Sequence, residues 1–506
     1  MSPKWSKEEI ESLKRLLKKL LDEDVLDQAR VVAKQLVGLL PTEWEQWFYL
    51  GVITARLGDP KTAEAYLGKA LELGGDKFPI SVQMAFTCRL RGDLEDAITW
   101  CRRGLDLKPA DASLHQVLAD LYAHSGEPEK AVEILEVLLR MPSLAQAELF
   151  STLTELGRLY LSMQKLDNAV TYFREALRMD GSNPTLWTNL GHCLSRKGDR
   201  KEAIEAFQRA ARLLPDSHNL YNLGDAFLGV KEPTKAIPPL FEAVRRNPDY
   251  ALAHYDLSLA YFTLGRYLEG AEEARAALRT DPEMMTGQIN LGTSATTNLG
   301  LCLMNLKRYE EALICFRRNE QALASTYFNI GLTLFRMKRN QEALKQFKRA
   351  LEIAPDDAEY LNLLGQTYTQ TGNYKAAEKY LRRSLELDPE NADSYHDLGN
   401  LLLKLKDRRK ESLRYFERAT ELNPDYEWAY YCIACYYSLA NKKTKALEYL
   451  HKALEKGMHD KDWIDADHDL DNLRADPRFN KLMAQFFKKE SSAVESQKSN
   501  GKAKKK

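Results

Sequence analysis

A short pattern of small residues returns thirteen times along this chain, with a period near 34 residues. Most copies have a small residue, an Ala twelve positions later and a Pro or Gly twelve positions after that. The clearest copies are Gly191, Ala203 and Pro215; Gly224, Ala236 and Pro248; Gly331, Ala343 and Pro355; and Gly365, Ala377 and Pro389. A fixed period of this length is typical of a solenoid of stacked helical units. Such a chain offers a long concave surface and seldom a catalytic pocket.

The first small residue of each copy sets the register of the repeat, and we number it position 8. Position 8 is occupied by Leu17, Gly51, Ala85, Ala119, Gly157, Gly191, Gly224, Ser258, Gly300, Gly331, Gly365, Gly399 and Ala434. Most steps between these residues are 33 to 35 positions long. The step from Ala119 to Gly157 is four residues too long, and the step from Ser258 to Gly300 is eight too long.

The apolar residues within each copy predict two amphipathic helices. They recur at i, i+3, i+4 and i+7, the spacing of one helix face. Small residues at the Gly and Ala positions let two helix backbones approach closely, because a larger side chain would wedge them apart. The closing Pro ends the second helix, since it lacks a backbone N–H. Each copy is therefore predicted to be an antiparallel helix pair.

One copy carries nearly the full signature of a known family. The pattern W-x2-L-G…A-x3-F-x2-A…P is present as Trp187, Leu190, Gly191, Ala203, Phe207, Ala210 and Pro215. It resembles the tetratricopeptide repeat (TPR), and the resemblance covers roughly residues 6–457. The resemblance implies an all-α fold, a right-handed superhelical solenoid of about thirteen TPR helix hairpins, with protein–protein interaction as its function.

The two ends depart from the pattern in the way that capping units do. Residues 1–43 are predicted to form a capping hairpin that begins with a capping box, Ser6 to Glu9. Residues 458–487 resemble the closing motif that follows many bacterial TPR arrays, and would lay Trp463, Leu470, Leu473 and Phe479 over the last helix. Residues 488–506, with seven Lys and two Glu, are predicted to be a disordered tail.

The long step after Ser258 predicts an irregular junction that divides the array into residues 44–286 and 287–457. Asn290-Leu291-Gly292 is repeated eight residues later as Asn298-Leu299-Gly300. Either the first helix is overlong here, or an extra turn is inserted through Thr293–Thr297. We expect this junction to be the most weakly stacked, and it is either a bend or a surface bulge without a mechanical role.

A row of polar side chains marks a candidate peptide-binding surface. On a helical wheel, positions 4, 7, 8 and 11 of the first helix form the core stripe, and positions 2, 5, 6, 9 and 13 lie opposite, on the concave face. Position 6 is Asn189, Asn222, Asp256, Asn298 and Asn329 in five successive copies. An Asn side chain can pair with both N–H and C=O of an extended backbone. The row resembles the asparagine ladder of the TPR superhelix of O-GlcNAc transferase, although the catalytic domain of that enzyme has no counterpart here.

Aromatic residues at position 5 lie beside this row, among them Tyr221, Tyr255 and Phe328. They could hold apolar side chains of a peptide, or equally pack on the neighbouring helix. The Asn residues could likewise be solvated side chains of a common TPR sequence. Because the row faces away from the core stripe, its removal is expected to leave the melting temperature almost unchanged.

Other chemistry is not supported by the residue spacing. The Lys, Asn and Arg clamp by which some TPR proteins bind a C-terminal carboxylate is absent. Cys432 and Cys435 form a C-x-x-C in mid-helix without a second pair, whereas a zinc site needs four ligands. The acidic residues between Asp460 and Asp471 lack the Gly and Glu of a calcium loop. We therefore expect no catalytic residues, no metal and no cofactor.

Composition narrows the partners. The 73 basic and 73 acidic residues balance, so no bulk field favours nucleic acid. No stretch of about 18 apolar residues predicts a membrane span. Seven scattered Cys favour a cytoplasmic location. The chain is expected to be a monomeric, non-enzymatic adaptor that binds extended peptides in its concave groove. The alternatives are a self-assembling scaffold and a regulatory subunit of a separately encoded enzyme.

Overall fold

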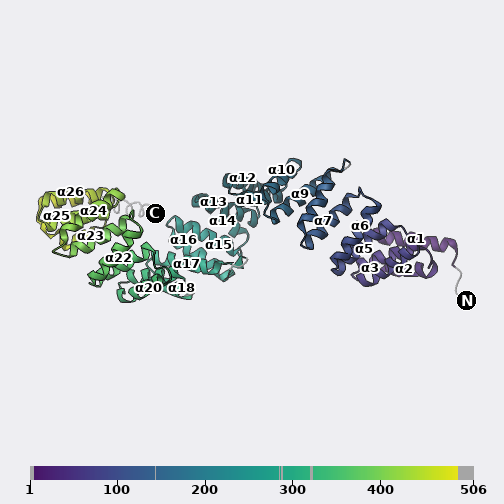
Figure 1. The fold of residues 1–506 in the computed structure, drawn as a ribbon, viewed down its shortest axis with the longest axis horizontal. Helices are drawn as coiled ribbons and strands as arrows, with labels where there is room; N and C mark the ends of the chain where they lie inside the picture. Colours follow the sequence, from purple (N-terminus) through teal and green to yellow (C-terminus); the bar gives the residue numbers. More distant parts are fainter. Residues whose placement is uncertain (1–4, 143, 284, 287–288, 320–322, 488–506) are drawn as a thin grey trace, which may run out of the picture. The chain divides into compact units, whose positions relative to one another are not determined.

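The computed structural model describes residues 5–142, 144–283, 285–286, 289–319 and 323–487. Within these residues, consecutive helices pair as antiparallel hairpins (Figure 1), and within each compact unit a hairpin packs on the next one along the chain. There are thirteen such hairpins in the described ranges, which confirms the predicted number. The contacts divide the chain into two compact units, Met1–Pro248 and Asp249–Lys506.

The first unit contains seven hairpins. They are α1 (Lys7–Asp22) with α2 (Leu26–Leu39), α3 (Trp44–Arg56) with α4 (Pro60–Glu72), α5 (Lys77–Arg91) with α6 (Leu94–Leu107), α7 (Ala112–His124) with α8 (Pro128–Leu139), α9 (Gln146–Ser162) with α10 (Leu166–Met179), α11 (Pro184–Lys197) with α12 (Arg200–Leu213), and α13 (Ser217–Gly229) with α14 (Pro233–Arg246).

The second unit contains six hairpins and a C-terminal cap. The hairpins are α15 (Ala251–Thr263) with α16 (Tyr267–Thr280), α17 (Leu291–Asn305) with α18 (Tyr309–Arg318), α19 (Ala324–Arg336) with α20 (Asn340–Ile353), α21 (Ala358–Gln370) with α22 (Tyr374–Leu387), α23 (Ala392–Lys404) with α24 (Arg409–Leu422), and α25 (Glu427–Leu439) with α26 (Lys443–Glu455). The cap contains α27 (Lys461–Ala466), the 3-10 helix η1 (His468–Leu470), α28 (Asp471–Arg474) and a helical segment at 477–487.

The small residue at position 8 brings the two helices of a hairpin into contact. A Cβ atom added to Gly191 would lie 2.6 Å from the ring of Phe207, and one added to Gly399 would lie 2.6 Å from Phe416. Both rings are buried. The Gly at position 8 therefore serves as the recess that receives the large apolar side chain of the second helix, as the sequence predicts.

The turn inside the hairpin has a fixed backbone conformation. In twelve of the thirteen described hairpins, a residue one or two positions after the first helix has a positive φ, the left-handed conformation that closes a helix C-terminus. Six of these residues are Gly, which adopts it without steric cost, and the other six are Asp24, Gln164, Lys231, Lys307, Lys338 and Asn441. The exception is the turn between α23 and α24.

Both ends of the chain have capping features. The Ser6 hydroxyl accepts a hydrogen bond from the Glu9 backbone N–H at 3.2 Å, and the Ser6 N–H donates to the Glu9 carboxylate at 2.6 Å, which confirms the capping box. At the other end, Leu470, Leu473 and Phe479 are buried in one cluster with Leu450 of α26. Trp463 is different from the prediction, since it remains 53 % exposed and the neighbouring Ile464 is buried in its place.

The prediction that the junction after Ser258 is weakly packed is wrong. Residues 285–286 and 289–290 form two short antiparallel strands, β1 (Met285–Thr286) and β2 (Ile289–Asn290), ahead of α17. Thr293–Thr297 lie inside α17, so no extra turn is inserted there. The helix packs on both α15 and α16, and Gly292 lies so close to the Pro282 carbonyl that an added Cβ would overlap it. The extra residues are thus absorbed in the connection before α17 and in the fifteen-residue length of that helix.

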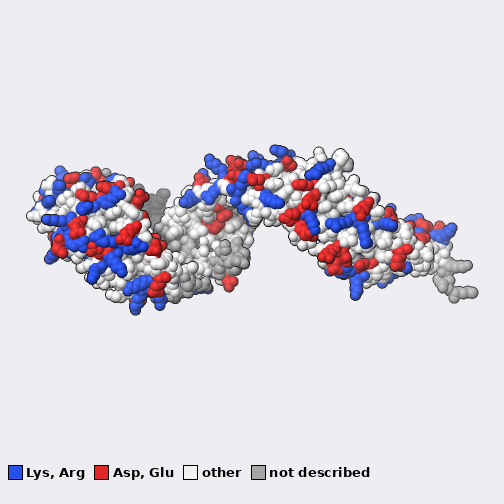
Figure 2. Space-filling view, viewed as in Figure 1, with Lys and Arg blue, Asp and Glu red and all other residues white. Residues whose placement is uncertain are grey.

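Charged residues of both signs are mixed over the surface of each unit on the face shown in Figure 2. Many of them form ion pairs three or four residues apart on one helix, such as Arg339 with Glu342 at 2.7 Å. In the part of the chain that the structure describes, no helix combines the length and the apolar character needed to cross a membrane.

Candidate functional site

The predicted row at position 6 lies deeper than the helical wheel indicates. In the first unit Asn189 is half-buried and Asn222 is only 5 % exposed. In the second unit Asp256 and Asn298 are 8 % and 4 % exposed, and Asn329 is half-buried. Within each unit, first helices of successive hairpins contact each other at several steps, such as α11 with α13 and α15 with α17. Asn298, for example, donates a hydrogen bond to the hydroxyl of Ser258 in α15.

This burial contradicts the premise that the row faces away from packed residues, on which the expectation of an unchanged melting temperature was based. Truncation of a buried, hydrogen-bonded Asn also removes a contact between hairpins. In the described residues, Nδ2 of Asn222 and Oδ1 of Asn298 are buried without a hydrogen-bond partner. Oδ1 of Asn362, at position 5 of α21, is also unpaired. These atoms give the row unused hydrogen-bonding capacity.

The aromatic residues at position 5 differ in their environment. Phe328 is buried and packs between hairpins, with its ring centroid 4.4 Å from that of Tyr360 and 5.8 Å from that of Phe347. Tyr221 and Tyr255 are half-buried, and burial raises the pKa of the Tyr255 hydroxyl. For Phe328 the structure thus supports packing on a neighbouring helix, the second of the two interpretations of these aromatic residues.

A larger site lies at the C-terminal end of the second unit. It is a cavity of about 610 Å³ between the first helices α21, α23 and α25 and the cap, and we name it the C-terminal pocket. Its walls are formed by Gln366, Thr369, Gln370, His396, Asp397, Asn400, Leu403, Lys404, Trp428, Tyr431, Cys432, Cys435, Trp463, Ala466, Asp467, His468 and Asp469.

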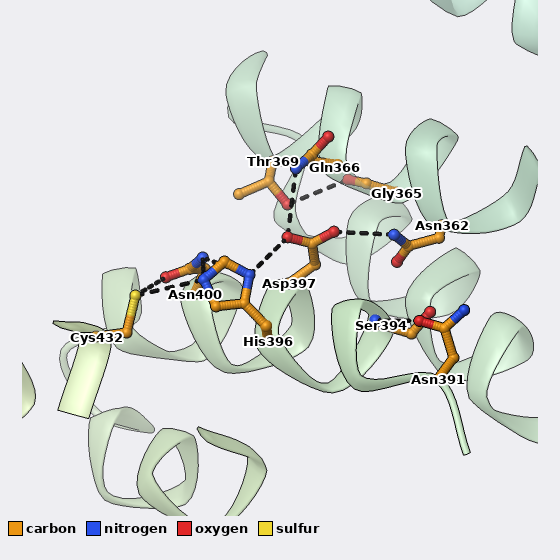
Figure 3. Close-up of polar contacts among 10 residues, drawn as sticks. All are labelled: Asn362, Gly365, Gln366, Thr369, Asn391, Ser394, His396, Asp397, Asn400 and Cys432. Carbon is orange, nitrogen blue, oxygen red and sulfur yellow. Dashed lines mark hydrogen bonds and ion pairs between the residues drawn. The ribbon is translucent and has the colours of Figure 1, made fainter. Parts of the chain in front are cut away.

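A polar network crosses the floor of the C-terminal pocket (Figure 3). The Asp397 carboxylate accepts hydrogen bonds from Asn362 Nδ2 at 2.9 Å and from Gln366 Nε2 at 3.3 Å, both on α21. Nδ1 of His396 lies 3.2 Å from the same carboxylate. On the opposite side, the Cys432 thiol of α25 donates to Asn400 Oδ1 at 3.2 Å. The network therefore connects three successive first helices.

Cys432, His396 and Asp397 are in the order of a nucleophile, a base and an orienting acid. Cys432 Sγ lies 3.5 Å from His396 Nε2. Burial by itself lowers the pKa of His396. The sulfur of Cys432 and the carboxylate of Asp397 have the opposite and larger effect, so the net pKa of His396 is raised. Cys432 is 8 % exposed and lies in the interior of α25, where backbone N–H groups form the helix ladder. No backbone donor is thus available beside the thiol to stabilise an oxyanion.

The cap contributes two carboxylates to the pocket. Asp467 accepts a hydrogen bond from the Tyr431 hydroxyl at 2.7 Å and lies 3.6 Å from the Cys435 sulfur. Its other oxygen accepts from the Asp469 backbone N–H at 2.9 Å. Burial, followed by the charge of Asp467, raises the pKa of Asp469.

Cys435, Asp467 and Asp469 have ligand atoms within 4.8 Å of one another, and these are donor types that zinc accepts. Burial raises the pKa of the Cys435 thiol well above its ordinary value, which disfavours the thiolate that binds a metal. Both oxygens of Asp467 already accept hydrogen bonds. These contacts explain the arrangement without an ion.

Models of the tetratricopeptide repeat match residues 154–218, 221–284, 294–318, 322–390 and 380–409. The chain is a tetratricopeptide repeat protein. Among curated relatives, the BBSome complex member BBS4 of Bos taurus is 28 % identical over 237 residues, which is 46 % of this chain and 44 % of the relative. The Drosophila melanogaster homolog of BBS4 is 24 % identical over 53 % of this chain and 51 % of the relative. The TPR chain thus spans about half the length of these relatives.

Among solved structures, the chain matches the APC/C hetero-tetramer Cut9–Hcn1 with 14 % identity and a TM-score of 0.40. The superposition covers 89 % of the TPR chain and 97 % of the solved chain. The likeness to the ladder of O-GlcNAc transferase stays a prediction.

The C-terminal pocket follows the same register as the predicted row. In the TPR numbering, His396 and Tyr431 are at position 5, Asp397 and Cys432 at position 6, and Gln366, Asn400 and Cys435 at position 9. The wheel therefore identifies the correct positions, but the search for repeated Asn missed the hairpins where these positions line a cavity. The signal was the concentration of His, Asp, Asn and Cys at positions 5, 6 and 9 of the last two hairpins.

Proposed function

We propose that this TPR protein is a non-enzymatic scaffold that binds an extended segment of a partner protein along the first helices of its hairpins, with the C-terminal pocket as the main binding site. One observation carries the proposal. The C-terminal pocket is formed by positions 2, 5, 6, 9, 12 and 13 of three successive first helices, and all of these except position 12 were assigned to the concave face. TPR proteins in general act through protein–protein interactions.

The composition of the pocket suits a peptide. Polar side chains such as Gln370 and Asn400 can pair with backbone N–H and C=O groups, whereas Leu403 and the aromatic residues can contact apolar side chains. The names of the relatives are consistent with such a role, because BBS4 is named as a member of the BBSome complex. Assembly with other proteins is the property that this proposal extends to the present chain.

The row of Asn189, Asn222, Asp256, Asn298 and Asn329, with Tyr221, Tyr255 and Phe328, is a secondary part of the proposal. Its members in each unit would pair with the backbone of a longer peptide. The half-buried Asn189 and Asn329 are the members best suited to contact it without rearrangement. The unpaired atoms of Asn222 and Asn298 would require a shift of the side chain.

The test starts from peptides selected from a random display library against the full chain. Their affinity is measured by fluorescence anisotropy for the wild type and for the double variant Gln370→Ala, Lys404→Ala. Both side chains are exposed and line the pocket, so the fold should be unchanged. Loss of two hydrogen bonds should cost about 1–3 kcal/mol, or roughly 5- to 150-fold in affinity.

The matched control is Lys375→Ala with Lys410→Ala, two exposed residues of the second helices α22 and α24. It should leave the affinity unchanged. Equal affinity for the wild type and the pocket variant would place the main site elsewhere. A second variant, Asn189→Ala with Asn329→Ala, tests the row independently, since weakening by this variant alone would favour the row over the pocket.

A further inference from the structure

The cap end of the C-terminal pocket has a corner of aromatic rings. The indole rings of Trp428 in α25 and Trp463 in α27 have centroids 5.9 Å apart and meet at 86°. The ring of Tyr431 lies 6.1 Å from that of Trp428, at 77° to it. In such edge-to-face pairs the edge of one ring lies against the face of the other, and a ring face that stays uncovered can attract a cation. Trp463 is 53 % exposed, so this corner opens to solvent.

Two carboxylates lie in the same part of the pocket. In the described ranges, neither Asp467 nor Asp469 forms an ion pair within 4.0 Å, whereas Asp465 pairs with Lys461, Asp471 with Arg474 and Asp476 with Arg478. Lys404 and Arg409 act on Asp469 only from a greater distance, and burial still dominates the pKa of its carboxyl group. The pocket therefore holds negative charge that nearby cations do not neutralise directly.

We propose that the cap end of the C-terminal pocket binds a cationic side chain, a Lys or Arg of the partner segment, between the Trp428–Trp463 corner and the carboxylates of Asp467 and Asp469. The inference rests on the proposed function and adds to it the kind of partner side chain that the pocket selects. The aliphatic stem of the side chain would cross Trp463, and its charged group would reach the carboxylates. A cation over indole rings and beside carboxylates is attracted by both.

The occupant that we propose is a partner segment and not the Lys-rich segment 488–506 of the same chain. The helical segment 477–487 that precedes this tail packs against α26, where the ring of Phe486 lies 5.4 Å from that of His451. The pocket, in contrast, is lined by α25 and by the cap residues before Leu470. The chain thus leaves the cap beside the second helix of the last hairpin, whereas the pocket lies along the first helices.

The experiment uses the full chain labelled with 5-fluorotryptophan and three capped peptides, acetyl-Gly-Ser-Ala-X-Ala-Ser-Gly-amide, in which X is lysine, trimethyllysine or norleucine. Fluorine NMR follows the tryptophan signals, which are assigned with Trp428→Phe and Trp463→Phe. The lysine and trimethyllysine peptides should shift both signals and bind about tenfold more tightly than the norleucine peptide, which has the stem without the charge. Salt should weaken this difference.

Asp469→Asn is the decisive variant, because its side chain is not used as a helix cap as that of Asp467 is. It should lower the affinity for the lysine peptide about tenfold and leave that for the norleucine peptide unchanged. Asp462→Asn is the matched control. It removes one negative charge from the same cap, and Asp462 does not line the pocket. It should have no effect on either peptide.

The other outcomes overturn the inference in distinguishable ways. Equal binding of the lysine and norleucine peptides would refute the cation site, while the display experiment could still support peptide binding in the pocket. If the lysine peptide bound only after the seven Lys of 488–506 were changed to Gln, the occupant would be the tail. If zinc chloride alone shifted both tryptophan signals and displaced the lysine peptide, the site would be a metal site of Cys435, Asp467 and Asp469.

Discussion

At the scale of single residues, the glycine at position 8 determines how closely the helices of a hairpin approach. The prediction can be tested within one hairpin, α3 with α4. In Gly51→Ala the new Cβ would lie 2.8 Å from Leu67, so we expect a loss of about 1–3 kcal/mol of stability. Gly68→Ala, one residue from Leu67, adds a Cβ with no atom within 4 Å and should gain about 0.5–1 kcal/mol. Urea unfolding of the two variants should show opposite shifts, and shifts in the same direction would contradict this account.

A second prediction concerns Cys101, which is fully buried in α6. Burial raises the pKa of its thiol from 9.0 to about 12. Above pH 9 the unfolded chain loses this proton while the folded chain retains it, so stability should fall as the pH rises from 9 toward 12. Between pH 9 and pH 10 the loss approaches about 1 kcal/mol. The urea midpoint of the wild type should therefore decrease relative to that of Cys101→Ala over this interval. Parallel midpoints would show that the thiol does not contribute.

The sequence located the residues of the candidate site only in part. The helical wheel placed positions 5, 6 and 9 on one face, and these positions do line the C-terminal pocket. It could not show that position 6 is buried between neighbouring first helices, as at Asn222 and Asn298, because this depends on how hairpins stack. Nor could it show that Asp467, which is distant in sequence, meets Tyr431 at 2.7 Å.

At the scale of helices and hairpins, the cap protects the last hairpin. Deletion of residues 458–506 removes Ile464, Leu470, Leu473 and Phe479, all buried against α25 and α26. The apolar surface that becomes exposed should drive self-association or unfolding of the last hairpin. Size-exclusion chromatography with light scattering should show aggregates or oligomers. Deletion of 488–506 alone is the control and should leave the protein unchanged, whereas an unaltered 1–457 chain would contradict a protective cap.

At the scale of the whole molecule, each hairpin depends mainly on its immediate neighbours. Phe207→Ala in α12 removes a ring that is 3 % exposed and packs on Gly191, which should cost about 3–5 kcal/mol locally. Amide hydrogen exchange should become faster in α11, α12 and the adjoining hairpins, while α23 to α26 keep their protection. Faster exchange over the entire chain would show all-or-none unfolding.

The architecture could be predicted from the sequence because it is repeated. Thirteen copies in one register specify the helices, their pairing and the small residues between them, such as Gly191 and Ala203. The structure at residues 285–290 could not be predicted in the same way, since the strands β1 and β2 lie where the repeat is interrupted. The division of the chain after Pro248 also has no mark in the repeat, which continues through Ser258 with its ordinary spacing.

The turns with positive φ allow changes in stability to occur separately from changes in ligand binding. Lys231, Lys307 and Lys338 occupy a conformation that glycine adopts more easily, and their side chains are exposed. A change between Gly and another residue at such a turn alters stability by about 1 kcal/mol without altering a residue that lines the C-terminal pocket. Stability can therefore drift through the turns while ligand preference is maintained, and binding residues that weaken the fold can be compensated at a distance.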